Sequence, residues 1–373
     1  MKIGIDASIL ARKKITGINR FLRNLLEHIL EIDKKNEYFL FAPCRLEEHK
    51  KRGFNVISVG ENRILSPKHY SPFWLNFVLP QALKKLQPDI FFQPNNFLPF
   101  FINTKKTKFI IAIHDLIPQM APQYRGFIYR AYLNILLPPS IKKSQTIITV
   151  SESSKKDIIK LYNVPAKKIY VIYEAADEKF RPRNLSREQK NNLISKYNLP
   201  RDFILHVGAI ENRKNIIGIL KISDLLKKLG KDIKIVLIGK PGFGSKEIFK
   251  EVKTRDNIYY LEYIQDKDLP HVYNLAKIFL FPSFYEGFGL PPLEAMQSGL
   301  PILTSNVSSL PEVVGEGGIM HDPRDYKSFT RDIIKLLDDK NFYQEMKNKA
   351  ILRAKNFSWR KSTEKLVNIF NKI

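Results

Sequence analysis

Residues 281–301, FPSFYEGFGLPPLEAMQSGLP, decide the fold of this chain because they join an apolar strand to a helix through a glycine-rich turn. Pro291 and Pro292 are typical of the first turn of a helix, which we expect over Pro291–Ser298. Backbone N–H groups at the start of a helix suit a phosphate. The turn consists of Gly287, Phe288, Gly289 and Leu290. We therefore predict that it binds an anion.

The pattern around this stretch runs twice along the chain. In each half, apolar runs such as FIIAIHDL and DFILHVGA alternate with helical segments such as 19–32 and 216–229. This alternation predicts an α/β fold with two parallel sheets, each covered by helices on both faces. The charged stretch DEKFRPRN, 177–184, separates the halves, and an amphipathic helix ends the chain over 357–373.

Composition limits the classes of function. The 373 residues include 62 Lys and Arg against 37 Asp and Glu, a net charge of +25. Such an excess attracts nucleic acid, anionic lipid or phosphorylated substrates, although a solvated basic surface would look the same. Nucleic-acid binding is not expected, since no module with interleaved aromatic and basic residues is present. Cys44 is the single cysteine and the histidines lack ligand spacing, so we expect no metal site.

The sequence also bears on localisation. Met1–Leu10 contains Asp6 within its apolar run and does not resemble a signal peptide, and no apolar stretch approaches the ~20 residues that span a bilayer. We expect a cytoplasmic protein that is soluble or peripheral at the inner face of the cell membrane. The aromatic stretch HYSPFWLNFVLP, 69–80, predicts binding to an anionic membrane surface. The alternative, that Trp74 and Phe77 are core residues, stays open.

Two glutamates could bind sugars. Glu286 precedes the helix of the opening stretch, and Glu294 lies about one turn inside it. A carboxylate accepts hydrogen bonds from two neighbouring hydroxyls, so ribose is a natural partner for Glu294. Glu286 could bind the hydroxyls of a sugar in the same way.

The stretch Ser283–Pro301 resembles the E-x7-E region of family 4 glycosyltransferases, and HVGAIENRKN, 206–215, resembles their V-G-x-x-x-x-R-K-N loop. The resemblance implies the GT-B fold, two Rossmann-like domains whose parallel sheets face an interdomain cleft. The acceptor-side domain would comprise 1–172, with the helix over 357–373 returning to it. The domain that binds the nucleotide sugar would comprise 173–356.

The resemblance also implies roles for single residues. Arg213 and Lys214 would meet the diphosphate of the donor, where fixed cations stabilise the charge of the leaving group. His114, at the end of FIIAIHDL, would lie near the donor sugar, and Gly17 would let the backbone approach phosphate or acceptor. Many relatives carry Arg where Ala209 stands, so the diphosphate would rely on two cations here.

The implied catalytic residues are His114, Glu286, Arg213 and Lys214. The implied donor-binding residues are Gly17, Gly208, Arg213, Lys214, Ile264, Glu286, Gly287, Phe288, Gly289, Leu290 and Glu294. Of these, Ile264 would contact the nucleobase through its backbone.

The implied activity is transfer of a hexose from a nucleoside diphosphate sugar to a glycan or polyprenyl-linked acceptor, with retention and without metal or other cofactor. The chain resembles bacterial mannosyltransferases of surface-polysaccharide and lipopolysaccharide assembly, which favours GDP-mannose as the donor. A nucleotide-sugar epimerase or hydrolase of similar fold remains an alternative. A basic nucleic-acid-binding protein is a further one.

Overall fold

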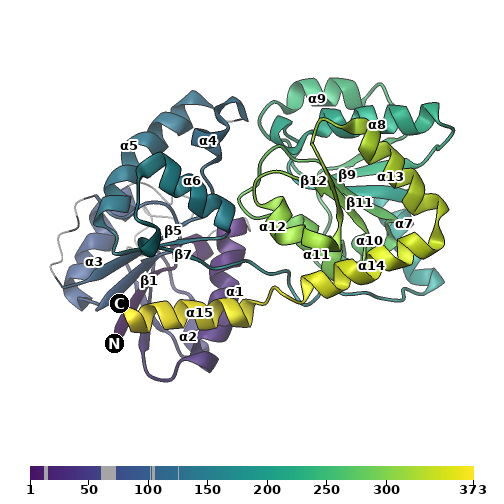
Figure 1. The fold of residues 1–373 in the computed structure, drawn as a ribbon. Helices are drawn as coiled ribbons and strands as arrows, with labels where there is room; N and C mark the ends of the chain where they lie inside the picture. The colour runs from purple at the N-terminus through teal and green to yellow at the C-terminus, as the bar shows by residue number, and fades with distance from the viewer. Residues whose placement is uncertain (12–15, 60–72, 101, 103–105, 125) are drawn as a thin grey trace. The chain divides into compact units, whose positions relative to one another are not determined.

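The computed structural model describes residues 1–11, 16–59, 73–100, 102, 106–124 and 126–373. They form two compact units (Figure 1). The first unit comprises Met1–Leu116, Ile128–Glu174 and Ser358–Ile373, and the second comprises Ile117–Phe127 and Ala175–Phe357. Each unit is built around one parallel sheet, which confirms the predicted α/β class.

The first unit has a seven-stranded sheet in the order β3-β2-β1-β4-β5-β6-β7. Its strands are β1 (Lys2–Asp6), β2 (Glu37–Ala42), β3 (Asn55–Ser58), β4 (Ile90–Gln93), β5 (Lys108–Ile113), β6 (Thr146–Thr149) and β7 (Ile169–Val171). Its helices are α1 (Gly17–Ile32), α2 (Glu47–Lys51), the π-helix η3 (Trp74–Val78), α3 (Leu79–Leu86), α5 (Phe127–Lys143), α6 (Glu152–Tyr162) and α15 (Trp359–Lys372). Helices α1 and α15 pack together on one face, and α3, α5 and α6 cover the other (Figure 1).

The second unit has a six-stranded sheet in the order β10-β9-β8-β11-β12-β13. Its strands are β8 (Phe203–Val207), β9 (Lys234–Ile238), β10 (Ile258–Leu261), β11 (Ile278–Phe281), β12 (Ile302–Ser305) and β13 (Ile319–His321). Its helices are α4 (Ile117–Met120), α7 (Arg187–Tyr197), α8 (Ile216–Lys228), α9 (Ser245–Val252), α10 (Leu269–Leu275), α11 (Leu290–Gln297), α12 (Leu310–Val314), α13 (Tyr326–Asp338) and α14 (Lys340–Ala354). Apolar side chains of α8, α9 and α13 form one core with the strands.

Both sheets have the same kind of switch point. Strand β1 lies between β2 and β4, and β8 lies between β9 and β11, so the chain leaves the two central strands in opposite directions. In parallel α/β sheets, ligands bind outside the carboxyl ends of the strands at such a point. The structure thereby positions two groups of loops: those after β1, β4 and β5 in the first unit, and those after β8 and β11 in the second.

Helix α5 is one of the helices that the sequence pattern did not predict. Its sequence, FIYRAYLNILLPPSIKK, is apolar on most sides and contains Pro138 and Pro139, so no amphipathic period stands out. Among the described residues, no helix is long and apolar enough to cross a membrane.

Candidate functional site

Two loops meet at the switch point of the second unit because β8 and β11 are hydrogen-bonded neighbours. Asn215 ties them together. Its side chain accepts a hydrogen bond from the Gly218 N–H and so caps the start of α8. Its Nδ2 donates to the carbonyl oxygens of Pro282 (3.1 Å) and Pro323 (2.6 Å). A Cβ at Gly218 would clash with the Asn215 side chain. The loop after β8 is therefore held against the loop after β11.

These loops bring together two cations and two carboxylates. Lys214 Nζ lies 2.6 Å from Glu286 Oε1, and Arg213 Nη1 lies 2.9 Å from the same oxygen. Arg213 also donates from Nη2 (2.6 Å) and Nε (3.0 Å) to Glu211 Oε1, and from Nη1 to the carbonyl of Tyr285 (2.6 Å). All four charged side chains are at least nine-tenths buried. The structure thus joins the predicted residues Arg213, Lys214 and Glu286, and adds Glu211, which the sequence analysis missed.

Burial makes this cluster electrostatically strong. Burial alone would raise the pKa of Glu286, but the charges of Arg213 and Lys214 outweigh it and hold that pKa well below its usual range. Burial also lowers the pKa of Lys214, although Glu286 opposes the shift. Lys214 Nζ further lies 4.5 Å from the centre of the Phe281 ring. The carboxylate therefore stays ionised at neutral pH between two cations.

The turn over Glu286–Leu290 is fixed by two serines that the sequence analysis also missed. Ser308 Oγ accepts a hydrogen bond from the Glu286 N–H (2.9 Å), while Ser309 Oγ lies within hydrogen-bonding distance of the carbonyls of Glu286 and Phe288. Gly289 has a φ of +113°, where a side chain would be strained. Pro291 and Pro292 lack an N–H, so the first turn of α11 has fewer donors than a helix start normally offers.

Glu294 has a different environment from Glu286. It is buried in α11, and its Oε2 accepts a hydrogen bond from the Tyr273 hydroxyl of α10 (2.9 Å). The seven-residue spacing therefore does not place the two carboxylates in one hydrogen-bonded group. One is bound to cations and the other to a phenol.

The remaining predicted positions of the second unit lie at neighbouring strand ends. Gly208 donates its N–H to the Ile238 carbonyl, and its own carbonyl leaves no room for a Cβ at Gly239, whose φ is +154°. The residues after Gly239 pair with the loop after β8, since Ile210 bonds through its backbone to Lys240 and Gly242. Ile264 is buried in the loop after β10.

His206 is a buried titratable group next to this cluster. Its Nδ1 lies 3.0 Å from the Leu280 carbonyl, which can only accept, so Nδ1 carries the proton. Its Nε2 has no hydrogen-bond partner among the described residues. Burial, helped by the charge of Lys214, lowers the pKa of His206 to about 4. The ring is therefore neutral at physiological pH.

The first unit holds His114 at the end of β5. Its Nε2 lies 2.9 Å from the carbonyl of Pro94, so this nitrogen carries the proton, and its ring packs edge-on against Phe21 of α1. Its Nδ1 faces Glu174 Oε1 at 3.8 Å. Gly17 is the first residue of α1, and among the described residues a Cβ there would meet no atom within 4 Å. The surroundings of Gly17 therefore do not themselves require a glycine.

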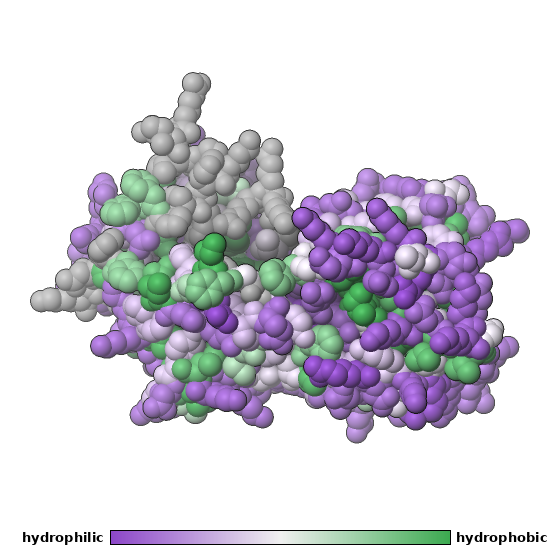
Figure 2. All heavy atoms as spheres, turned by 90° about the horizontal axis from the view of Figure 1, so that it is seen from above, coloured by the Kyte–Doolittle hydropathy of each residue, from purple (hydrophilic) through white to green (hydrophobic). Residues whose placement is uncertain are grey.

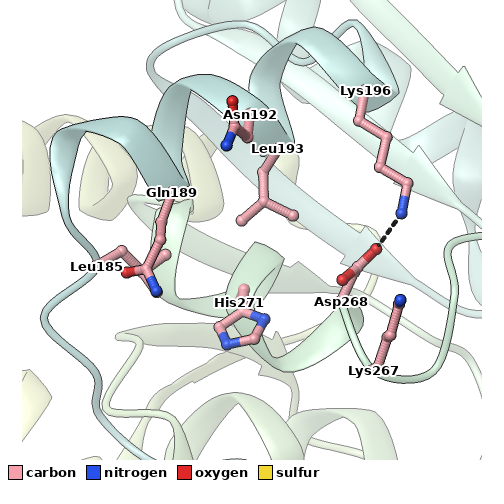
Figure 3. Close-up of a pocket in the computed structure, with 8 residues that line it drawn as sticks. All are labelled: Leu185, Gln189, Asn192, Leu193, Lys196, Lys267, Asp268 and His271. Atoms are coloured by element: carbon pink, nitrogen blue, oxygen red, sulfur yellow. Dashed lines mark hydrogen bonds and ion pairs between the residues drawn. The ribbon is translucent and has the colours of Figure 1, made fainter.

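Acidic residues do not gather into a metal site in the parts of the chain that the structure describes. Asp266 and Asp268 form the nearest match to a D-x-D motif. Figure 3 shows Asp268 at a pocket between α7 and α10, held by Lys196. Burial would raise its pKa, but hydrogen bonds from Lys196 Nζ (2.6 Å) and the Tyr197 hydroxyl (2.7 Å) lower it. This carboxylate thus anchors α7 to α10.

Two parallel α/β units, with a cation-bearing loop beside a glutamate-bearing loop at the switch point of the second, define a glycosyltransferase of the GT-B fold. Solved structures agree on the fold. The chain superposes on sucrose-phosphate synthase from Thermosynechococcus elongatus with a TM-score of 0.75 at 16% identity, over 100% of this chain and 98% of that one.

Sequence comparison then gives the family. Residues 15–180 match Glycosyltransferase Family 4, and residues 189–353 match Glycosyl transferases group 1. The O-antigen chain mannosyltransferase B of Escherichia coli is 35% identical over 78% of this chain and 76% of its own length. The O-antigen chain mannosyltransferase RfbU of Salmonella typhimurium is 30% identical over 59% and 58%. The chain belongs to glycosyltransferase family 4, the retaining glycosyltransferases that the motifs around Glu286 and Arg213 indicated.

Proposed function

We propose that this enzyme transfers mannose from GDP-mannose to a hydroxyl of a glycan or lipid-linked acceptor during assembly of a cell-surface polysaccharide. The observation that carries the proposal is its 35% identity, over most of both chains, to a protein named as an O-antigen mannosyltransferase. The similarity to a second mannosyltransferase of the same kind, from another organism, supports it.

The charge cluster supports a diphosphate leaving group. Breaking the glycosidic bond leaves negative charge on the phosphate oxygens, and preorganised cations stabilise that charge in the transition state. Lys214 supplies a compact ammonium and Arg213 a planar fork. Both cations are ion-paired with Glu286. A diphosphate, which carries more charge than one carboxylate, competes with Glu286 for Lys214, and we infer that this exchange directs the glutamate to the hexose.

The other predicted residues keep the roles given by the resemblance. In this proposal Glu294 binds the ribose hydroxyls, Ile264 the nucleobase and the turn after Glu286 a phosphate. His114 contacts the donor sugar. The first unit, with Gly17, binds the acceptor, and the second unit binds the nucleotide sugar. No metal ion takes part, because the cations neutralise the leaving group.

A donor panel tests the proposal. Thermal unfolding is measured with GDP-mannose, GDP-fucose, UDP-glucose and UDP-N-acetylglucosamine, since a ligand that binds the native state raises its stability by mass action. GDP-mannose should give the largest rise, and incubation with acceptor should release GDP. A larger rise with a UDP-sugar would overturn the donor assignment. Conversion of the donor without acceptor would favour an epimerase or hydrolase.

A further inference from the structure

Exposed apolar side chains concentrate on one part of the first unit. Seven large ones lie between residues 73 and 135 of the described chain, and each is between 37% and 84% exposed. One of them, Phe127, is the first residue of α5 and is grouped with the second unit, and the other six belong to the first. The six of the first unit are Phe73, Phe77, Phe100, Ile128, Tyr132 and Ile135. Figure 2 shows hydrophobic residues gathered on this side of the first unit, whereas the surface of the second unit is mostly hydrophilic in the same view. Contiguous apolar surface of this kind marks an interaction site.

Helix α5 contributes the most exposed part of this surface. Leu133 and Leu137 are buried and face the core of the unit, whereas Ile128 and Ile135 are 84% and 67% exposed on another side of the same helix. Ile128, Tyr132 and Ile135 follow one another at the spacing of a single helical face. A helix that is apolar on both sides is normally covered on both. This one is covered on one side by its own unit.

The segment after β4 connects α5 with η3. The Phe97 ring packs against the Tyr132 ring at 5.2 Å, and the Leu98 N–H donates to Ser140 Oγ of α5. Two residues further on, the Phe100 N–H donates to Asn76 Oδ1 of η3 (2.7 Å). The segment Phe97–Phe100 therefore links η3 to α5, and we call the exposed apolar side chains of these three segments the α5 surface.

The sequence analysis located only the edge of this surface. Of the stretch 69–80, residues 69–72 lie outside the described residues. The structure divides the two residues that the sequence left open, because Trp74 is a core residue with 1% exposure, whereas Phe77 is 51% exposed. Phe73 pairs with the Phe77 ring at 5.2 Å.

The charges around the α5 surface are one-sided. Between Phe73 and Lys143 the sequence has nine Lys or Arg but only two acidic residues, Asp89 and Asp115. Helix α5 has no acidic residue and ends in Lys142 and Lys143. Asp89 lies at the amino end of the sheet, the end at which α5 also finishes, and its Oδ2 accepts from the Lys2 N–H. The surface is therefore apolar with a basic surround.

We propose that the α5 surface docks onto a lipid bilayer that contains anionic headgroups. Apolar side chains enter the boundary between headgroups and acyl chains, and the surrounding Lys and Arg attract the anionic lipid. A second copy of this chain is a poor occupant, because each copy has a net charge of +25 and the copies repel. The docking requires no donor sugar, so it can be tested apart from the proposed activity.

The test is flotation of the full chain with vesicles of phosphatidylcholine alone or mixed with phosphatidylglycerol. The chain should bind the anionic vesicles at least about tenfold better, and binding should fall as salt rises from about 50 to about 500 mM. The variant Ile128→Ser with Ile135→Ser should lose about tenfold in affinity, because burial in the interface depends on apolar area. The variant Lys84→Gln with Lys142→Gln should lose the preference for anionic lipid.

Matched controls come from the second unit. Leu229 and Leu352 are 61% and 67% exposed there, so Leu229→Ser with Leu352→Ser removes similar apolar area and should leave binding unchanged. Thermal unfolding of each variant verifies that it is folded. Equal binding of the Ile128/Ile135 variant and the wild type would overturn the proposal. So would a lack of preference for anionic vesicles, or a dimer that the same double variant dissociates while vesicles bind neither protein.

Discussion

The switch points of the two units show how differently one topology can hold polar groups. In the second unit, Arg213 and Lys214 share Glu286 at 2.9 and 2.6 Å inside a buried cluster that Asn215 closes. In the first unit, His114 has one short hydrogen bond and faces Glu174 only at 3.8 Å.

This difference teaches that preorganisation comes from the loops and not from the sheet. Four buried charges must all be paired, because an uncompensated one costs several kcal/mol, and pairing fixes their positions. A single histidine that faces a carboxylate at 3.8 Å carries no such requirement. The second unit is thus suited to one fixed charge pattern, such as that of a diphosphate, and the first can tolerate variation around its histidine.

The largest expected effect is loss of Lys214, one of the two cations that share Glu286. Lys214→Ala should lower kcat by about 10²–10³, since one preorganised donor to the leaving group disappears. Steady-state kinetics and thermal unfolding measure it. Lys227→Ala, which removes a half-exposed lysine elsewhere in the second unit, is the matched control and should keep wild-type kinetics. Wild-type turnover of Lys214→Ala would remove this residue from the site.

The two glutamates sharpen the comparison within the second unit. Glu286→Gln should mainly lower kcat, with a rise of several kcal/mol in the activation free energy. The reason is that the glutamate is expected beside the hexose, where charge develops during transfer. Glu294→Gln should mainly raise the donor KM, since contacts to ribose are uniform along the reaction. GDP titrated by calorimetry should bind Glu286→Gln normally and Glu294→Gln poorly. Equal loss of GDP affinity in both would mean that they act as one structural unit.

A matched pair of carboxylates compares the two units directly. Glu211 accepts two short hydrogen bonds from Arg213, whereas Glu174 has no oxygen closer than 3.8 Å to His114 Nδ1. Glu211→Gln should therefore lower the free energy of unfolding by about 2–3 kcal/mol, and Glu174→Gln by less than about 1 kcal/mol. Urea unfolding of both variants measures this. Equal losses would contradict the contrast drawn between the units.

Because His206 is buried, the stability of the second unit depends on pH. Its folded pKa, about 4, lies below that of the unfolded chain, so the unfolded state binds the proton first and stability falls as the pH falls from about 7 to 4. Between pH 7 and 5 the loss should be roughly 1–2 kcal/mol. His206→Phe should remove this part of the slope in urea unfolding. An unchanged slope in the variant would assign the effect to other groups.

The smallest expected effect is that of a chelator. Because Arg213 and Lys214 neutralise the leaving group in the proposed mechanism, EDTA should leave the transfer rate nearly unchanged. The rate is measured after dialysis against EDTA, with added magnesium or manganese as the control. Complete loss that either metal restores would require the charges at Glu286 to be interpreted again.

The fold was predictable because its signals are local. Alternation of apolar runs with helical segments predicted both sheets, and the turn before Pro291 identified the switch point of the second unit within one residue of the start of α11. Helix α5 escaped prediction because it is apolar on both sides and lacks a period. Its exposed face would have counted as core in any pattern of hydrophobicity.

The sequence by itself determined the family, the two sheets and the residue types at the strand ends, since each of these is carried by residues adjacent in the chain. Only the tertiary structure decided which groups meet. Glu211 and Glu286 lie 75 positions apart, yet both bind Arg213, and Ser308 holds the backbone of Glu286 from 22 positions away. It also separated Trp74 in the core from Phe77 on the surface. Such choices depend on which loops a parallel sheet brings side by side, and that is fixed by packing across the strand order.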